Sequence, residues 1–136
     1  MDEGGFREIR VSKRASTNPT AAAIATLSML DGLEEEFAQG AVDFLCEMQN
    51  DEGGFRANTR IPIADLLSTF TSLVALGDLG AIAEVNIPAV EKFAASLKHE
   101  DGGFLGAAWD EKCDVEYSFY GLGTLALCAI RDQPIQ

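Results

Sequence analysis

The sequence is poor in the groups that bind nucleic acids or anionic membranes. Its 136 residues include 10 Lys and Arg against 22 Asp and Glu, which gives a formal net charge of −12. Phosphate backbones and anionic lipid surfaces attract clustered cations, so we expect no nucleic-acid partner. No apolar run approaches the roughly 18 residues that a transmembrane helix needs. The acidic N-terminus does not resemble a signal peptide.

Cysteine and histidine are also scarce. Cys46, Cys113 and Cys128 are widely spaced without a CxxC pair, and His99 is the only histidine. This pattern excludes a disulfide scaffold and provides no self-contained zinc motif. Reduced thiols predict a cytoplasmic protein. Hydrophobic residues, at 47%, are abundant enough for a folded core.

The strongest pattern is a repeat of 49 residues. A Gly-Gly-Phe motif preceded by acidic residues occurs three times, at Gly4-Gly5-Phe6, Gly53-Gly54-Phe55 and Gly102-Gly103-Phe104. The flanks match without gaps, so that Ser16, Asp65 and Asp114 are in register. Self-similarity of this kind is typical of stacked helical repeats. We interpret the chain as one domain of three repeats, over residues 2–50, 51–99 and 100–136, of which the last is incomplete.

Each repeat predicts an inner and an outer helix. The inner helices, over residues 19–30, 65–79 and 114–130, are apolar or small nearly all round, which predicts burial on several sides. The outer helices, over 34–49 and 88–98, carry a single apolar stripe such as Phe44, Leu45 and Met48. The prediction is an all-α fold of about five helices in a curved stack. Both ends of the chain look cut, or completed by something else.

Two segments resemble a known family. The stretch Gly40–Phe55 is similar to the repeat of protein prenyltransferase β subunits and of squalene and oxidosqualene cyclases. The stretch Asp114–Leu127 resembles the inner-helix segment of prenyltransferase β subunits, the closer branch. The resemblance implies an α/α toroid, a ring of about six helix pairs around an apolar cavity that holds isoprenoid chains. This chain would form a partial ring.

The resemblance also implies where a metal would bind. Prenyltransferases of this family bind zinc with an Asp, a Cys two residues later and a His from a following repeat. Asp114 matches the Asp, whereas Glu116 replaces the Cys and Cys113 precedes the Asp. The Arg and Lys of the family's diphosphate clamp correspond to Ala108 and Glu111. The implied metal site at Asp114 and Cys113 is incomplete, and zinc would require residues from elsewhere or from a partner.

A carboxylate pair is the candidate catalytic group. Asp114 and Glu116 keep two acids of the proton-donor motif of the cyclases, and paired carboxylates can raise one another's pKa. Helix capping is the alternative role for Asp114 and for Asp65. The candidate substrate-pocket residues lie at helical spacing on inner helices, and ordinary core packing is their alternative: Phe70, Tyr117, Tyr120 and Gly121, with Phe119 beside them.

Two functions follow from these patterns. The first is a prenyltransferase- or terpene-cyclase-like protein of the transferase type. Its inner helices would line an isoprenoid-type cavity, and it would not be catalytically complete alone. The alternative is a non-catalytic α/α-repeat module for binding or assembly. A stack that is open at both ends leaves apolar helix faces bare, so we expect self-association or a covering partner.

Overall fold

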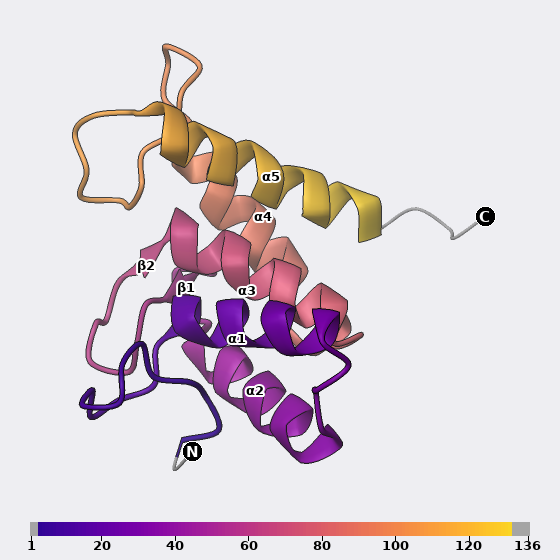
Figure 1. Ribbon diagram of the computed structural model, residues 1–136. Helices are drawn as coiled ribbons and strands as arrows, with labels where there is room; N and C mark the ends of the chain where they lie inside the picture. Colours follow the sequence, from indigo (N-terminus) through magenta and orange to yellow (C-terminus); the bar gives the residue numbers. More distant parts are fainter. Residues whose placement is uncertain (1–2, 132–136) are drawn as a thin grey trace.

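The computed structural model describes residues 3–131 and contains five α-helices in that range (Figure 1). They are α1 (Thr17–Met29), α2 (Glu35–Met48), α3 (Leu66–Asp78), α4 (Ile87–Ser96) and α5 (Val115–Arg131). Every helix begins and ends within two residues of the range that the sequence predicts. The all-α prediction of about five helices is therefore confirmed.

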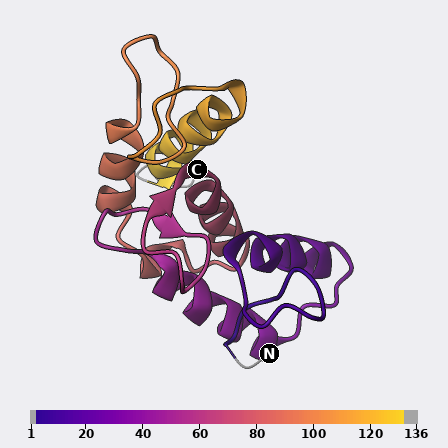
Figure 2. The same cartoon turned by 90° about the vertical axis from the view of Figure 1, so that its left-hand side faces the viewer.

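The helices form two layers. The inner helices α1, α3 and α5 lie side by side, and the outer helices α2 and α4 cover one side of them (Figure 2). Helix α3, at the centre of the inner layer, has buried residues on several faces. Helix α2 buries one stripe, which includes Ala41, Phe44, Leu45 and Met48. The apolar pattern of each helix thus determines its layer. A helix that is apolar on several sides is buried in the inner layer, and a helix with one apolar stripe covers it from outside.

Four phenylalanines anchor the core between the layers. Phe55 and Phe104, from the Gly-Gly-Phe motifs, are buried, as are Phe44 of α2 and Phe93 of α4. Burial of one such side chain stabilises the fold by about 1.5–3 kcal/mol. The phenylalanines of the second and third motifs therefore join inner and outer helices, whereas Phe6 of the first motif is only partly buried.

A pair of short strands begins at the second motif, which the sequence analysis did not predict. Strand β1 (Phe55–Arg56) pairs antiparallel with β2 (Ala64–Asp65), with Phe55 opposite Asp65. An isolated bridge joins Phe104 to Asp114 in the third repeat. Strands of two residues are too short to show the alternating pattern by which strands are recognised in a sequence.

The same hydrogen bonds recur at intervals of 49 residues. The backbone N–H of each motif phenylalanine donates to a hydroxyl 14 residues later: Phe6 to Thr20 (2.8 Å), Phe55 to Thr69 (2.9 Å) and Phe104 to Ser118 (3.2 Å). Each hydroxyl donates in turn to the carbonyl four residues before it, at 2.7 Å, on Ser16, Asp65 and Asp114. We interpret these recurrences as the three repeats of the sequence.

Glycine is required where loop and outer helix meet. Gly53 has a φ of 95°, and a side chain there would collide with the carbonyl of Ala89 in α4. Gly4 has a φ of 75° and lies in the same way against Gly40 of α2. Only glycine combines a positive φ with such a close approach of two backbones.

The connection between α3 and α4 contains a short 3₁₀ helix, Ile82–Glu84. Over residues 3–131, no helix has the length and apolar character to cross a bilayer.

Candidate functional site

The inner side of the stack is the candidate site, and it is apolar. Helices α1 and α3 contain no Lys or Arg, and α5 contains only Arg131 at its last position. Val74 of α3 and Phe119 of α5 remain 37% and 62% exposed. Such a surface favours apolar contacts and offers no fixed cation to an anionic group.

Three aromatic rings gather where α3 meets α5. The ring centroids of Phe70, Phe119 and Tyr120 are 5.4–5.6 Å apart. Separations of this size are typical of favourable aromatic pairs. The ring of Phe70 also packs on Gly123, where a side chain would have no room. The structure thus brings together Phe70 and Tyr120, two of the four residues that the sequence places in a pocket.

Tyr120 has a polar contact at the edge of this aromatic group. Its hydroxyl donates to Oε1 of Glu116 at 3.2 Å. Burial and the hydrogen bond to Glu116 raise the pKa of Tyr120. The phenol therefore stays protonated over the physiological range and holds Glu116 beside the rings.

The other two predicted pocket residues point elsewhere. The ring of Tyr117 lies against Gly106 and Asp110 in the loop before α5. Burial is the main cause that raises the pKa of Tyr117, and the negative charges of nearby Asp110 and Asp114 raise it further. Gly121 is buried under the ring of Phe104, in the core between α4 and α5. Both residues therefore support packing away from the aromatic group.

A groove between α1 and α3 continues the apolar surface. Its volume is about 240 Å³, which is below the roughly 300–1,000 Å³ of complete ligand pockets. Small side chains on α1 leave this space: Ala21, Ala22 and Ala25 face Thr71, Val74, Ala75 and Asp78 of α3, with Asn18 at one end. The sequence analysis did not identify these alanines. The sequence did contain an indication of the groove. Ala21 occupies the repeat position that Phe70 and Phe119 occupy in the other repeats, so a small side chain stands where the others have aromatic rings.

The candidate catalytic acids hold separate hydrogen bonds. Oδ1 of Asp114 accepts from the N–H of Tyr117 at 2.8 Å and so caps α5. Asp65 caps α3 in the same way, from the N–H of Ser68 at 2.7 Å. These contacts match the capping alternative. Glu116 accepts the hydroxyl of Tyr120, so the two acids are held by different donors.

Asp65 differs from Asp114 in its surroundings. Burial raises the pKa of Asp65, although hydrogen bonds from Ser68 and Leu67 act in the opposite direction. A carboxylate that is buried at a helix start carries a desolvation cost that an exposed one avoids. This cost couples the protonation of Asp65 to folding.

The residues present do not fit a zinc ion. Within residues 3–131 there is no group of three His, Cys, Asp or Glu side chains that could hold a metal. Cys113 packs on Gly103, as Ala15 and Ala64 pack on the corresponding motif glycines. Zinc sites in proteins have three or four protein ligands. Asp114 and Cys113 together therefore fall short of one.

One of the two clamp positions, Glu111, lines an acidic hollow. A cavity of about 510 Å³ beside the start of α5 is lined by Trp109, Asp110, Glu111, Lys112, Asp114 and Tyr117. Three carboxylates and a single amine line this space. Ala108, the other clamp position, is exposed. Like charges repel across such short distances, so the hollow disfavours a diphosphate.

Comparison with known proteins identifies a family. A family model described as the prenyltransferase alpha-alpha toroid domain matches residues 2–135. No curated protein matches the chain at a significant level. The family match agrees with the resemblance carried by the Gly-Gly-Phe repeats and with a partial ring of five helices.

Proposed function

The chain belongs to the prenyltransferase α/α toroid family, and from that premise we propose that its inner helices bind an isoprenoid-type chain. We propose further that this polypeptide does not perform prenyl transfer or cyclisation alone. The observation that carries the proposal is the inner surface itself. It combines the rings of Phe70, Phe119 and Tyr120 with an alanine-lined groove, and α1 and α3 contribute no cation to it.

The hydrophobic effect supplies the driving force for binding. Each Å² of apolar surface removed from water contributes about 25 cal/mol. A branched hydrocarbon in the groove would cover Ala22, Ala25 and Val74, and its far end would reach the aromatic group. The groove alone is smaller than a complete ligand site, so the ligand would be partly covered.

The charges support binding without turnover. Chemistry on an allylic diphosphate needs cations or a metal ion at the developing negative charge. Glu111, which corresponds to one residue of the family's clamp, lines a hollow together with Asp110 and Asp114. The described side chains do not supply a metal-binding group in its place.

Paired ligands test this proposal. Farnesol and farnesyl diphosphate are titrated into the protein by calorimetry, with and without zinc. We expect the uncharged alcohol to bind at least as tightly as the diphosphate, and zinc to have no effect. Absence of farnesol binding, or a zinc-dependent preference for the diphosphate, contradicts the proposal.

A pair of valine variants locates the site. Val74→Asp places a charge in the groove and should weaken farnesol binding by tenfold or more, because a charge resists desolvation. Val11→Asp is the matched control, since Val11 is 81% exposed in the first loop, and it should bind as the parent does. Equal binding by both variants would place the ligand elsewhere.

The second candidate is the assembly module. One observation favours it: among the described residues, large apolar side chains at α1 and α5 are exposed, among them Met29, Leu30, Phe119 and Leu122.

A further inference from the structure

Within residues 3–131, the stack ends at α5 in an edge that no helix covers. Val115 and Leu122 of this helix are 87% and 61% exposed. Their counterparts 49 residues earlier, Leu66 and Leu73 of α3, are 0% exposed, and α3 is the inner helix that α5 covers. The α5 edge, defined by Val115, Phe119, Leu122 and Ile130, therefore presents the positions at which an inner helix receives its next neighbour.

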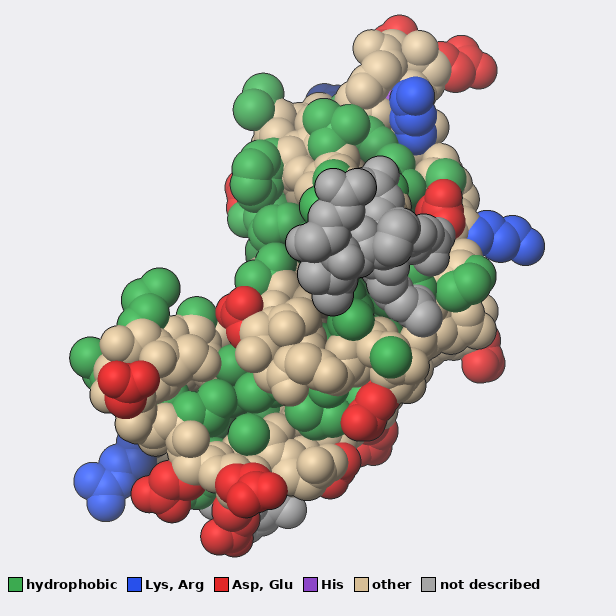
Figure 3. Space-filling view, turned by 90° about the vertical axis from the view of Figure 1, so that its right-hand side faces the viewer, with side chains coloured by type: hydrophobic (Ala, Val, Ile, Leu, Met, Phe, Trp, Pro, Cys, Tyr) green, Lys and Arg blue, Asp and Glu red, His purple; other side chains and the backbone are tan. Residues whose placement is uncertain are grey.

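The other end of the stack has the opposite edge. Leu30, directly after α1, is 72% exposed, whereas Cys128 at the matching position of α5 is 2% exposed. Thr26 is exposed, whereas Thr124 is fully buried. The α1 edge, defined by Ala22, Thr26, Met29 and Leu30, presents the positions at which an inner helix packs on the preceding one. On the side where the inner helices end, hydrophobic patches lie between acidic side chains (Figure 3).

The two edges are complementary in shape. At the junction of α3 and α5, Phe70 packs against Tyr120 and Gly123. One repeat further on, Phe119 takes the place of Phe70, and Ala22 and Ala25 of α1 take the places of Tyr120 and Gly123. Phe119 is exposed and the alanines are small, so a ring would meet a surface with room for it.

The backbone offers a matching hydrogen bond. The N–H of Thr17 at the start of α1 donates to the carbonyl of Ala57 in the next repeat, at 2.9 Å. The N–H of Leu66 donates to the carbonyl of Gly106 in the same way, at 2.8 Å. In a continued stack, the corresponding pair is the N–H of Val115 and the carbonyl of Glu8.

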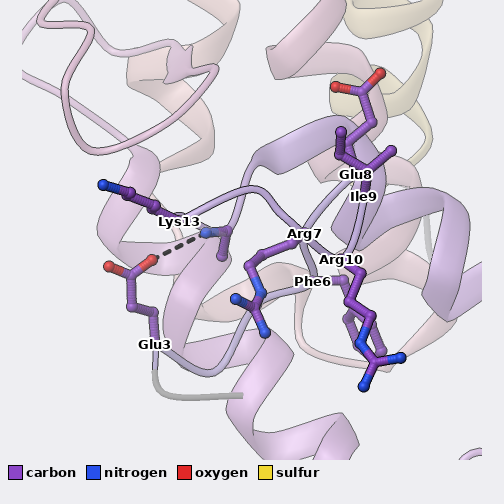
Figure 4. Close-up of a pocket in the computed structure, with 9 residues that line it drawn as sticks. Glu3, Phe6, Arg7, Glu8, Ile9, Arg10 and Lys13 are labelled. Atoms are coloured by element: carbon purple, nitrogen blue, oxygen red, sulfur yellow. Dashed lines mark hydrogen bonds between the residues drawn. The ribbon is translucent and has the colours of Figure 1, made fainter.

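The loops beside the two edges carry opposite charge. Residues 7–14 hold four basic side chains and one acid, and the guanidinium groups of Arg7 and Arg10 point to the same side of the loop (Figure 4). Residues 105–112 hold two acids and one lysine, and Asp114 and Glu116 follow. Loops of adjacent repeats touch, since Nη1 of Arg14 lies 3.3 Å from Oγ1 of Thr59. In a continued stack this contact falls on Lys112 and Arg10, which are both basic, within a meeting of a loop of net positive charge and one of net negative charge.

From these complementary edges we propose that the protein associates head to tail with itself. The α5 edge of one copy binds the α1 edge of a second copy and continues the spacing of the inner helices. A head-to-tail contact joins two different surfaces, so it closes into a ring or extends into a chain. This arrangement gives the assembly candidate a specific partner, and because Phe119, Ala22 and Ala25 also belong to the proposed isoprenoid surface, the second copy and the ligand would share these residues.

Complementing variants test the arrangement. Leu122→Glu blocks the α5 edge and Leu30→Glu blocks the α1 edge, and both residues are exposed, so each variant should keep the helical circular dichroism of the parent. Light scattering coupled to gel filtration should give at least twice the mass of one chain for the parent and the mass of one chain for each variant. An equimolar mixture of the variants should form a two-chain species, because one intact edge of each kind remains.

The outcomes separate the alternatives. Ile61→Glu is the control, since Ile61 is 38% exposed in the second loop and belongs to neither edge, and it should associate like the parent. A monomeric parent at about 100 μM overturns the proposal, and so does a mixture that stays monomeric. An association that survives Leu30→Glu would be a contact of α5 with α5, which also overturns it. Farnesol binding is measured on the monomeric variants, so a failure of the association proposal can be told apart from a failure of the ligand proposal.

Discussion

The hydroxyl of Thr69 provides a direct test of how the Gly-Gly-Phe loop is held. Thr69 is fully buried, accepts the N–H of Phe55 at 2.9 Å and donates to the carbonyl of Asp65 at 2.7 Å. Thr69→Val keeps the shape of the side chain and removes both contacts. The N–H of Phe55 would then be buried without a partner, which costs about 1–3 kcal/mol. The carbonyl of Asp65 loses less, because it can also accept within the first turn of α3.

We therefore expect Thr69→Val to lower the free energy of unfolding by about 2 kcal/mol. With an m-value of about 2 kcal/mol/M, the urea midpoint would fall by about 1 M at an unchanged slope. Circular dichroism at a fixed protein concentration measures the midpoint, since association would shift it. Hydrogen exchange should show that the amide of Phe55 loses protection.

Two variants control for other effects. Thr69→Ser keeps the hydroxyl, as Ser118 does in the third repeat, and loses one methyl group, worth about 0.8 kcal/mol. It should retain protection of the Phe55 amide. Ser96→Ala removes an exposed hydroxyl that bonds to its own helix at Phe93, and it should change stability by less than about 0.5 kcal/mol. If Thr69→Val stays within that range and Phe55 remains protected, the hydroxyl does not hold the loop.

Two further predictions concern backbone and charge. In urea unfolding, Gly53→Ala should destabilise the fold by at least about 2 kcal/mol more than Gly102→Ala. Both glycines have a positive φ, but Gly53 faces the carbonyl of Ala89 whereas Gly102 faces open space. Equal costs would show that the contact with α4 is irrelevant. Burial raises the pKa of Asp65 in the folded state, so the folded state binds that proton more tightly than the unfolded state. The negative charge of Asp65 lowers the free energy of unfolding. This loss is absent below the unfolded-state pKa of about 4 and grows as the pH rises through the folded-state pKa. Asp65→Asn, which keeps a capping oxygen, should therefore gain stability relative to the parent between pH 4 and 7 in urea titrations. A difference that does not vary with pH would refute this.

The candidate site was only partly predictable from sequence. Phe70 and Tyr120 were proposed together and lie together, with ring centroids 5.4 Å apart. Tyr117 and Gly121 were proposed with them, but Tyr117 contacts Gly106 in the loop before α5, and Gly121 lies under the ring of Phe104. Successive helix residues point about 100° apart, so neighbours in sequence reach different surroundings. Which of these surroundings is the inner face depends on how α5 is rotated against α3 and α4.

For Asp65 and Asp114, too, the sequence predicts one property and not another. The positions of Asp65 and Asp114 directly before apolar segments pointed to capping, and each accepts an N–H of its own helix. Capping is local, because donor and acceptor are three residues apart. The burial that raises the pKa of Asp65 is not local, and no short segment of sequence contains it.

The order of inner and outer helices could be read from the chain, because local periodicity and a 49-residue spacing encode which faces are apolar and where each helix ends. The different solvent exposure of equivalent residues could not be predicted in this way. Leu73 and Leu122 occupy the same position in successive repeats, yet one is buried and the other is 61% exposed. The difference arises because a neighbouring helix covers the first and none of the described helices covers the second. Exposure is a property of the assembled stack, and only the packing of whole helices sets it.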